Sequence, residues 1–346
     1  MRYNRLGHTG LFVSELCLGT MTFGGEGMWT AIGTLDQSES NALVKSALDS
    51  GVNFIDTANV YSNGLSERIT GQALKDCGIA RHDVVLATKA LGPMGDGIND
   101  RGASRHHLMN QVDASLKRLQ LEYIDLYQIH GWDPATPMEE TLRTLDDIVR
   151  SGKVRYIGVS NWAAWQIAKA LGLSERQRLE RFASLQAYYS LAGRDLEREI
   201  VPMLESEGVG LMVWSPLAGG FLSGKYTRDG TEEGRRKEFD FPPIDKEKGY
   251  DAVEVMQAIA REKSASVPQI ALAWLLAKPF VSSVIVGARK PEQLKDNLGA
   301  ISVELSEEDM ERLNAAAPPV STYPGWMIDR QGEYRKGAMA GERPKN

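Results

Sequence analysis

The feature that most constrains the fold is a regular alternation of short apolar segments with longer amphipathic segments along almost the whole chain. The apolar segments are rich in Val, Ile and Leu, which is typical of buried strands, and the segments between them have the apolar spacing of helices. Strands joined by helical crossovers pair in parallel, so eight such units predict a closed (β/α)₈ TIM barrel. The predicted strands are residues 16–21, 51–56, 84–89, 124–130, 154–160, 183–188, 210–214 and 281–287.

The remaining segments extend this plan within a single predicted domain spanning 1–346. Residues 5–15 have the pattern of a β-hairpin, and Asp36 with Glu39 has the spacing of a capping box for the first helix. A long polar segment, 219–249, precedes the last predicted helices at 251–263, 267–277, 291–298 and 306–316. The end of the chain, 317–346, is rich in Gly, Pro and charge and is predicted to be a surface tail.

An open doubly wound sheet is the main alternative to the barrel, because it also alternates strands with helices. A sheet of that kind that binds a dinucleotide carries Gly-x-Gly-x-x-Gly after its first strand. The sequence has no such motif at that place, so we prefer the barrel.

The composition limits which binding partners and which cell compartment are expected for this chain. The 346 residues have a formal net charge of -6 and include only two cysteines, Cys17 and Cys77. The acidic balance argues against nucleic acid or an anionic membrane as the partner, and so few cysteines are typical of a reducing compartment. The N-terminus lacks the apolar stretch of a secretory signal, and no apolar run approaches the length of a membrane span. We therefore expect a cytoplasmic protein.

Polar or aromatic side chains stand at or next to the end of every predicted strand, at the end of a barrel where active sites are built. The strand bodies are mostly Val, Ile, Leu and Ala, so packing alone would not place such a ring of side chains there. The eight positions are Thr20, Asp56, Lys89, His130, Asn161, Gln186, Trp214 and Arg289.

Four side chains from consecutive predicted strands could together donate a proton to a substrate oxygen: Asp56, Tyr61, Lys89 and His130. Each alone is weak evidence, because an Asp after a strand more often caps a helix and a lone Tyr more often packs in the core. A phenol has a pKa of about 10, so we expect Lys89 to lower the pKa of Tyr61 toward neutrality, with Asp56 keeping Lys89 charged. His130 would orient or polarise the substrate oxygen. The group suits protonation of a carbonyl that is receiving hydride.

The sequence resembles the aldo-keto reductase superfamily, in a branch related to bacterial aldo/keto reductases and potassium-channel β subunits. The matching motifs run in the family's order and cover nearly the whole chain. They are Leu-Gly-Thr-Met at 18–21, Phe-Ile-Asp-Thr-Ala-x-x-Tyr at 54–61, Thr-Lys at 88–89, Gln-Ile-His at 128–130, Gly-Val-Ser-Asn at 158–161, Trp-Ser-Pro-Leu at 214–217 and Val-Gly-Ala-Arg at 286–289. The resemblance implies an oxidoreductase that reduces an aldehyde or ketone to an alcohol, with Tyr61 as the proton donor.

The resemblance also implies a nicotinamide cofactor bound without a Rossmann fold. Ser160, Asn161 and Gln186 would hold the carboxamide, and Trp214 would stack on the nicotinamide ring. Arg289 would meet the adenosine 2′-phosphate, since an Arg fork suits a phosphate dianion, and this favours NADPH over NADH. The other implied cofactor-binding residues are Gly19, Thr20, Met21, Asp56 and Gly287, the pyrophosphate-lining Ser215, Pro216, Leu217 and Ala218, and Gln293 and Asn297 near the adenine.

The segment 219–249 resembles the cofactor-covering loop of the same branch. Lys225 and Arg235 would clamp cofactor phosphates, although 235–237 would equally suit a solvated loop. The segment begins like a P-loop, with Gly-x-x-x-x-Gly-Lys at 219–225. Tyr226 stands where a P-loop needs Ser or Thr to hold Mg²⁺, which argues against nucleoside triphosphate hydrolysis.

Two other functions are alternatives to carbonyl reduction. A barrel lyase or aldolase could use Lys89 as a Schiff-base nucleophile, but it would leave Trp214 and Arg289 without a role. A cofactor-sensing binding subunit with little turnover fits the channel-subunit resemblance, yet His130 retains the histidine that this branch commonly replaces. No metal site is expected, because no zinc motif occurs, and no Gly-x-Ser-x-Gly elbow of a serine hydrolase occurs either.

The substrate is expected to be a small carbonyl compound, and aromatic residues in loops are candidates for the walls of its pocket. Each of them could instead pack at the rim of the barrel. The candidates are Phe23, Trp29 and Trp132, together with Tyr323 and Trp326 near the end of the chain.

Overall fold

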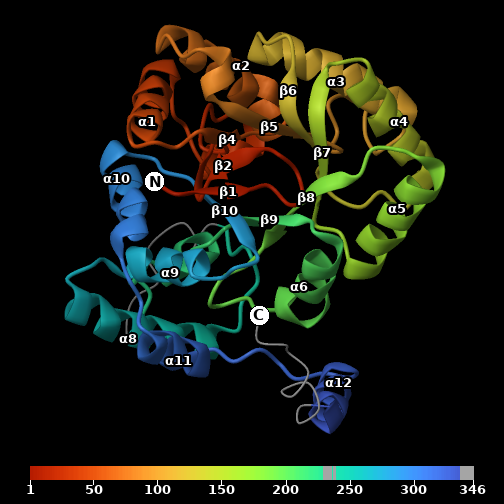
Figure 1. Ribbon diagram of the computed structural model, residues 1–346. Helices are drawn as coiled ribbons and strands as arrows, with labels where there is room; N and C mark the ends of the chain where they lie inside the picture. Colours follow the sequence, from red (N-terminus) through yellow and green to blue (C-terminus); the bar gives the residue numbers. More distant parts are fainter. Residues whose placement is uncertain (229–235, 237–238, 336–346) are drawn as a thin grey trace, which may run out of the picture.

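The barrel predicted from the alternation is confirmed. The computed structural model describes residues 1–228, 236 and 239–335, and in this part of the chain eight parallel strands close into a ring surrounded by helices (Figure 1). The strands pair in chain order, and β10 closes the barrel by pairing with β3. The strands of the barrel are β3 (Leu16–Gly19), β4 (Phe54–Asp56), β5 (Val85–Ala90), β6 (Ile124–Ile129), β7 (Val154–Ser160), β8 (Phe182–Tyr188), β9 (Gly210–Trp214) and β10 (Val281–Val286).

Helices pack around the outside of the ring, and the first of them begins where the sequence predicts a cap. The predicted capping box of α1 is present, because Asp36 accepts from the Glu39 backbone N–H at 2.8 Å and Glu39 accepts from the Asp36 N–H at 3.0 Å. Within the described ranges, no helix combines the length and the apolar character that crossing a bilayer requires. The α-helices are α1 (Gln37–Asp49), α2 (Leu65–Asp76), α3 (Arg105–Leu119), α4 (Met138–Arg150), α5 (Ala164–Gln177), α6 (Leu196–Glu207), α8 (Lys246–Lys263), α9 (Val267–Leu276), α10 (Pro291–Leu298), α11 (Glu307–Ala316) and α12 (Gly325–Gly332).

Two segments predicted as loop or tail contain helices. Helix α8 begins at Lys246, five residues before the predicted start, because Asp245 accepts from the Lys248 N–H and caps it before any apolar spacing is visible in the sequence. Helix α12 and the 3₁₀ helix η6 lie in the predicted tail. Other short 3₁₀ helices lie within the loops. The 3₁₀ helices are η1 (Gly27–Ala31), η2 (Tyr61–Gly64), η3 (Arg81–Asp83), η4 (Ala218–Ser223), η5 (Gly299–Ser302) and η6 (Glu333–Arg335).

An apolar cluster fills the interior of the barrel below its C-terminal mouth, because successive residues of a strand face opposite sides and residues two apart share the interior. The cluster includes Phe54, Ala87, Leu126, Met212 and Ile285, with Cys17. Two positions further along the chain from the first five stand Asp56, Lys89, Gln128, Trp214 and Gly287. These positions are staggered along the barrel, since Asp56 pairs with Ala87 in the register of β4 and β5, whereas Lys89 pairs with Gln128 in that of β5 and β6.

The N-terminal hairpin covers the opposite end of the barrel. Its strands are β1 (Tyr3–Arg5) and β2 (Phe12–Ser14), which pair antiparallel as predicted. Leu6 and Val13 are fully buried in the same cluster as the apolar layer. Gly7 has a φ of +59°, and a Cβ there would lie 2.5 Å from the Ala183 carbonyl oxygen, so the hairpin backbone sits directly on the strand ends. The predicted site residues therefore lie at the opposite, C-terminal end of the barrel strands.

Gly158 in β7 leaves room for the side chains of Ser184 and Gln128, so replacing it should lower stability. A Cβ on Gly158 would lie 2.7 Å from the Ser184 Oγ and 3.3 Å from the Gln128 Cγ. We expect Gly158→Ala to lower the free energy of unfolding by about 1–3 kcal/mol through overpacking. Gly172→Ala is the control, since nothing lies within 4 Å of that position in α5, and it should stabilise the protein by about 0.5–1 kcal/mol. Urea unfolding measures the free energy of unfolding of both variants. Equal changes in the two would contradict this account of the packing.

Candidate active site

The loop that carries Tyr61 follows β4 directly and has an unusual backbone. Ser62, Asn63 and Gly64 all have positive φ, of 48°, 53° and 89°. Two non-glycine residues in the left-handed region store strain that the surroundings must offset, and such strain is concentrated at functional sites. The Ser62 hydroxyl donates to the Phe23 carbonyl at 3.3 Å, which ties this turn to the loop after β3. The turn fixes the direction in which the Tyr61 ring leaves the backbone.

Lys89 is the centre of the group at the mouth of the barrel. Its side chain is 0% exposed, and its ammonium donates to Asp56 Oδ2 at 2.6 Å, to the Thr57 carbonyl at 2.8 Å and to Tyr61 Oη at 3.3 Å. An ammonium has three N–H donors, so these three partners use all of them. A fully buried charge is stable only when it is paired and hydrogen-bonded in this way.

Asp56 faces the interior and accepts from three side chains. Its Oδ2 accepts from Lys89, while Oδ1 accepts from Gln186 Nε2 at 2.9 Å and from Gln128 Nε2 at 3.2 Å. The carboxylate is therefore fully engaged in holding its neighbours. Gln128 was missing from the predicted site, although its place two residues before His130 in a strand puts both on the interior face. Gln186, expected at a cofactor carboxamide, uses its amide N–H₂ on Asp56.

The ionisation of the pair Tyr61 and Lys89 differs from the prediction. Burial raises the pKa of Tyr61 and outweighs the lowering by the Lys89 charge, so the phenol stays protonated at neutral pH. Burial alone would lower the pKa of Lys89, but the charge of Asp56 and the contact with Tyr61 outweigh it, and the pKa stands above its ordinary value. The resting pair is a neutral phenol beside an ammonium, which can give a proton and then stabilise the phenolate that remains.

His130 lies beside Tyr61 as a neutral imidazole. The two rings meet edge to face with centroids 5.8 Å apart. Burial, with a further contribution from the Lys89 charge, lowers the pKa of His130 to about 3. A neutral imidazole carries one N–H donor and one acceptor nitrogen, so it can orient a substrate oxygen without adding charge.

The strand ends on the far side of the barrel form a second polar group. Asn161 has a positive φ of 59°, and its side chain donates to the His130 carbonyl at 3.2 Å and accepts from Trp214 Nε1 at 3.0 Å. Ser160 pairs with Gln186 in the β7–β8 register. The Ser160 hydroxyl is buried and has no hydrogen-bond partner among the described residues. Buried polar atoms are normally satisfied, so this hydroxyl is available to hydrogen-bond a polar group at the mouth of the barrel.

Comparisons with known proteins show which family this chain belongs to. A model described as the Aldo/keto reductase family matches residues 15–318. The chain belongs to the aldo/keto reductase family. An uncharacterised oxidoreductase of Bacillus subtilis, YrpG, is 39% identical over 328 residues, which cover 92% of this chain and 96% of the relative. A probable voltage-gated potassium channel subunit beta of Oryza sativa is 39% identical over 88% of this chain and 92% of its own length. A putative aryl-alcohol dehydrogenase of Schizosaccharomyces pombe is 37% identical over 92% of this chain and 96% of its own length.

The family assigns the chain to the oxidoreductases and supports the reduction of a carbonyl group. Its members use nicotinamide cofactors. In the part of the chain that the structure describes, His, Cys, Asp and Glu side chains do not gather into a group that could hold a metal.

The segment after β9 in this aldo/keto reductase is tightly folded. Ser215, Ala218, Gly219 and Gly220 all have positive φ, and the Gly219 N–H donates to the Ser215 Oγ at 2.9 Å. Pro216 and Ala218 are buried, Leu217 is partly buried, and Lys225 is exposed. Arg235 lies outside the described residues.

Arg236 is buried and does not belong to a solvated loop, while positions 235 and 237 lie outside the described residues. The Arg236 guanidinium donates to the Ala218 carbonyl at 2.7 Å and to the Pro242 carbonyl at 2.9 Å, and pairs with Asp240. The sequence shows only a run of charges there, because no local pattern indicates that Arg236 binds the carbonyls of Ala218 and Pro242, 18 and 6 positions away. Arg236 thus anchors the segment that follows η4.

Trp214 has two aromatic neighbours that the sequence did not indicate. Phe241 lies nearly parallel to it, with centroids 5.7 Å apart and an interplanar angle of 8°, and Tyr188 lies 5.2 Å away at 37°. Phe241 comes from the predicted covering segment, so that segment reaches the residue proposed to stack on a nicotinamide ring.

The residues predicted near the adenosine lie along α10 and in the loop before it. Gln293 accepts from the Arg289 backbone N–H at 3.0 Å, and Asn297 is buried. The Arg289 guanidinium donates to the carbonyls of Ala31 and Ile32. Just after β3, the Thr20 hydroxyl lies 2.9 Å from that of Ser66, so it joins this loop to the first turn of α2. Of the other predicted cofactor positions, Gly19 is buried, Met21 is partly buried and Gly287 is exposed.

The predicted aromatic walls separate into different places. Phe23 departs from the expectation, because it is fully buried in the outer core and presents no face to a pocket. Trp29 packs edge-on against Tyr61 with centroids 5.3 Å apart. Trp132 packs against Trp162 at 4.9 Å and Trp165 at 6.3 Å, and Trp165, which the sequence analysis missed, is 62% exposed.

Tyr323 and Trp326 lie at the start of α12, which extends beyond the ring of helices in Figure 1. Both are exposed, and their rings contact each other with centroids 5.9 Å apart.

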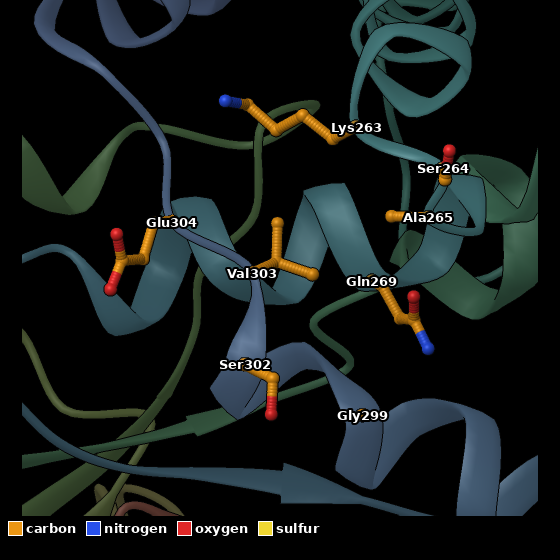
Figure 2. A pocket seen from close by; sticks show the side chains of 8 residues that line it. All are labelled: Lys263, Ser264, Ala265, Gln269, Gly299, Ser302, Val303 and Glu304. Atoms are coloured by element: carbon orange, nitrogen blue, oxygen red, sulfur yellow. The ribbon is translucent and has the colours of Figure 1, made fainter.

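A pocket of about 420 Å³ at the end of α8 does not belong to this site (Figure 2). Two of its polar side chains already have protein partners, since Lys263 pairs with Asp309 at 2.8 Å and Gln269 donates to the Asp296 carbonyl at 2.9 Å. Residues of the proton-donating group do not line it. The lining residues are Lys263, Ser264, Ala265, Gln269, Gly299, Ser302, Val303 and Glu304.

Proposed function

We propose that this aldo/keto reductase uses NADPH to reduce an aromatic aldehyde or ketone to the alcohol, with Tyr61 as the proton donor. The observation that carries the proposal is the position of the Lys89 ammonium, 2.6 Å from Asp56 and 3.3 Å from Tyr61 Oη in a fully buried setting. A phenol next to a fixed, buried cation is suited to protonate an oxygen that gains negative charge.

In this mechanism each side chain has a separate task. The reduced nicotinamide supplies the hydride when it is bound. Tyr61 donates its proton to the carbonyl oxygen, and Lys89 stabilises the phenolate as it forms. Asp56 keeps Lys89 charged and in place through its contact at 2.6 Å, and does not itself transfer a proton to the substrate. The neutral His130 ring directs the substrate oxygen toward Tyr61.

The barrel mouth fits a nicotinamide carboxamide at one particular atom. The buried Ser160 hydroxyl has no partner among the described residues, and a carboxamide offers both a donor and an acceptor to it. Next to it, Asn161 and Trp214 are already hydrogen-bonded to each other and form a fixed wall. Open backbone at Gly287 and Gly220, where an added Cβ would meet little or nothing, leaves space for a larger ligand.

The pH dependence of reduction follows from the two shifted pKa values. The pKa of His130 is about 3 and that of Tyr61 is raised by burial, so neither group changes charge over the neutral range. We expect kcat at saturating cofactor to be nearly constant from about pH 5 to about pH 9, and to fall above the ordinary phenol value of about 10 as the donor loses its proton. Initial rates across buffers measure this profile. A tenfold change centred near pH 6–7 would mean that His130 titrates, and would contradict the assignment.

Preference for NADPH is assigned to Arg289. It stands at the start of α10, where a helix N-terminus and a guanidinium together suit a phosphate. We expect Arg289→Ala to weaken NADPH binding by about 10–100-fold, the value of a charge-assisted hydrogen bond, and NADH binding far less. Fluorescence titration of both cofactors measures the two dissociation constants, and equal losses would remove this assignment.

The proposal of an aromatic substrate rests on Trp29 beside Tyr61 and on the aryl-alcohol dehydrogenase relative. The channel-subunit relative suggests a second candidate, a cofactor-binding subunit with little turnover. The complete group of Asp56, Tyr61, Lys89 and His130 favours the reductase. We further propose that the protein acts in the cytoplasm, since Cys17 and Cys77 are both free thiols.

A further inference from the structure

Arg289 connects two loops that are far apart in the sequence. Its Nε donates to the Ile32 carbonyl at 3.1 Å, and its Nη2 donates to the carbonyls of Ala31 at 2.8 Å and Ile32 at 2.9 Å. These carbonyls lie at the C-terminal end of η1, where the last carbonyls of a helix lack partners within the helix and favour a cation. A planar guanidinium can span two such oxygens, so Arg289 caps this 3₁₀ helix from the loop after β10.

The capped turn is the one that carries Trp29. The N–H groups of Ile32 and Gly33 both donate to the Trp29 carbonyl, at 2.9 Å and 3.1 Å. The indole of Trp29 packs against the Tyr61 ring with centroids 5.3 Å apart and an interplanar angle of 64°. A shift of the carbonyls that Arg289 binds would therefore move the backbone from which the Trp29 ring extends.

Other contacts close the base of the same loop. Gly24 donates to the Leu35 carbonyl at 2.9 Å, and Leu35 donates to the Thr22 carbonyl at 3.2 Å. The Thr22 hydroxyl donates to the Ala288 carbonyl at 3.0 Å, which joins the base to the residue just before Arg289. The base is thus fixed to the barrel, and Arg289 acts on the distal turn.

We propose that Arg289 is a positioning residue that holds Trp29 against Tyr61 and so sets the apolar wall on which the ring of an aromatic carbonyl substrate packs. The inference rests on the proposed function and deepens it. The role is separate from the phosphate contact assigned to the same side chain, because Nε and Nη2 hold the loop. Nη1 has no hydrogen-bond partner among the described residues, so it can face a phosphate at the same time.

Kinetics with NADH separate the two roles, because NADH has no 2′-phosphate for Arg289 to bind. Arg289→Lys keeps the charge but cannot span two carbonyls. At saturating NADH, we expect it to raise KM for a bulky aromatic aldehyde by about three- to tenfold, the value of an aromatic contact, with kcat and the KM of propanal changed by less than about twofold. Lys290→Ala, at the exposed neighbouring position, is the matched control and should leave both KM values unchanged.

A double-mutant cycle tests whether Arg289 acts through Trp29. Trp29→Ala should raise the KM of the aromatic aldehyde as Arg289→Lys does, and adding Arg289→Lys to Trp29→Ala should change it by less than about twofold more, since coupled residues are non-additive. An unchanged KM in Arg289→Lys, or additive effects of the two replacements, would overturn the proposal.

Hydrogen exchange gives a readout that needs no turnover. In the cofactor-free protein, Arg289→Ala should speed exchange of the Ile32 and Gly33 amides by about tenfold or more, because their hydrogen bonds lie in the turn that loses its cap. Exchange at the Leu35 amide in the fixed base should stay the same. Unchanged exchange at Ile32 and Gly33 would overturn the proposal. If no carbonyl is reduced at all, the proposed function fails while this measurement still decides the role of Arg289.

Discussion

Replacing Tyr61 by Phe is expected to lower kcat for carbonyl reduction by about 10²–10⁴-fold, the usual contribution of a positioned general acid. The ring remains to pack against Trp29 and His130, so the pocket keeps its shape and only the transferable proton is lost. The dissociation constant of NADPH should be unchanged, because the phenol lies at the substrate side. Steady-state turnover and cofactor titration measure the two effects separately.

Tyr127→Phe is the matched control for this replacement. Tyr127 is a fully buried tyrosine in β6 whose hydroxyl has no partner among the described residues, and it packs in the outer core rather than at the mouth. Removing that hydroxyl should leave turnover intact. Full activity of Tyr61→Phe, or an equal loss in both variants, would show that the proton comes from elsewhere.

Lys89→Met is expected to damage stability and activity together. The replacement leaves the Asp56 carboxylate buried without its cation, and breaking a buried pair in this way costs about 3–5 kcal/mol of unfolding free energy. Turnover should fall by at least about 10²-fold, because the charge that stabilises the phenolate is gone. Denaturant unfolding and steady-state kinetics measure the two losses.

Two further variants separate the effects on stability and activity. Asp56→Asn with Lys89→Met removes both charges, so it should recover most of the lost stability and none of the lost activity. Lys45→Met breaks an exposed pair with Asp49 and should leave stability nearly unchanged. A stable and active Lys89→Met would contradict the role of this ammonium.

The barrel could be predicted because its determinants are local. β4, β5 and β6 are short buried segments joined by helical crossovers, and parallel pairing brings their C-terminal ends together at one mouth of the barrel. Asp56 and Lys89 meet because both side chains face the interior at the C-terminal ends of adjacent strands, with Lys89 two residues beyond Ala87, the register partner of Asp56. Helix α1 could be placed by its capping box for the same reason, since both partners lie within one turn.

Some features of the site could not be predicted from the sequence. They depend on contacts between residues that are separated in the chain, or on burial and charge acting in opposite senses on one pKa. Gln128 reaches Asp56 across the barrel, and Arg236 is buried by carbonyls that no local pattern indicates. Arg289 binds the carbonyl of Ile32, 257 positions away in the chain. The direction of the Tyr61 pKa shift could not be predicted, because burial and the charge of Lys89 act in opposite senses and only the folded geometry decides between them.

The most direct test of the central claim is a single turnover of NADPH with an aromatic aldehyde, comparing the wild-type protein with Tyr61→Phe. The oxidation of the nicotinamide is followed by absorbance, and the alcohol is quantified in the same samples. The account predicts one alcohol for each NADPH oxidised by the wild type, and a rate lower by about 10²–10⁴-fold in the variant. NADPH that binds but is oxidised by no carbonyl, or equal rates in the two proteins, would contradict it.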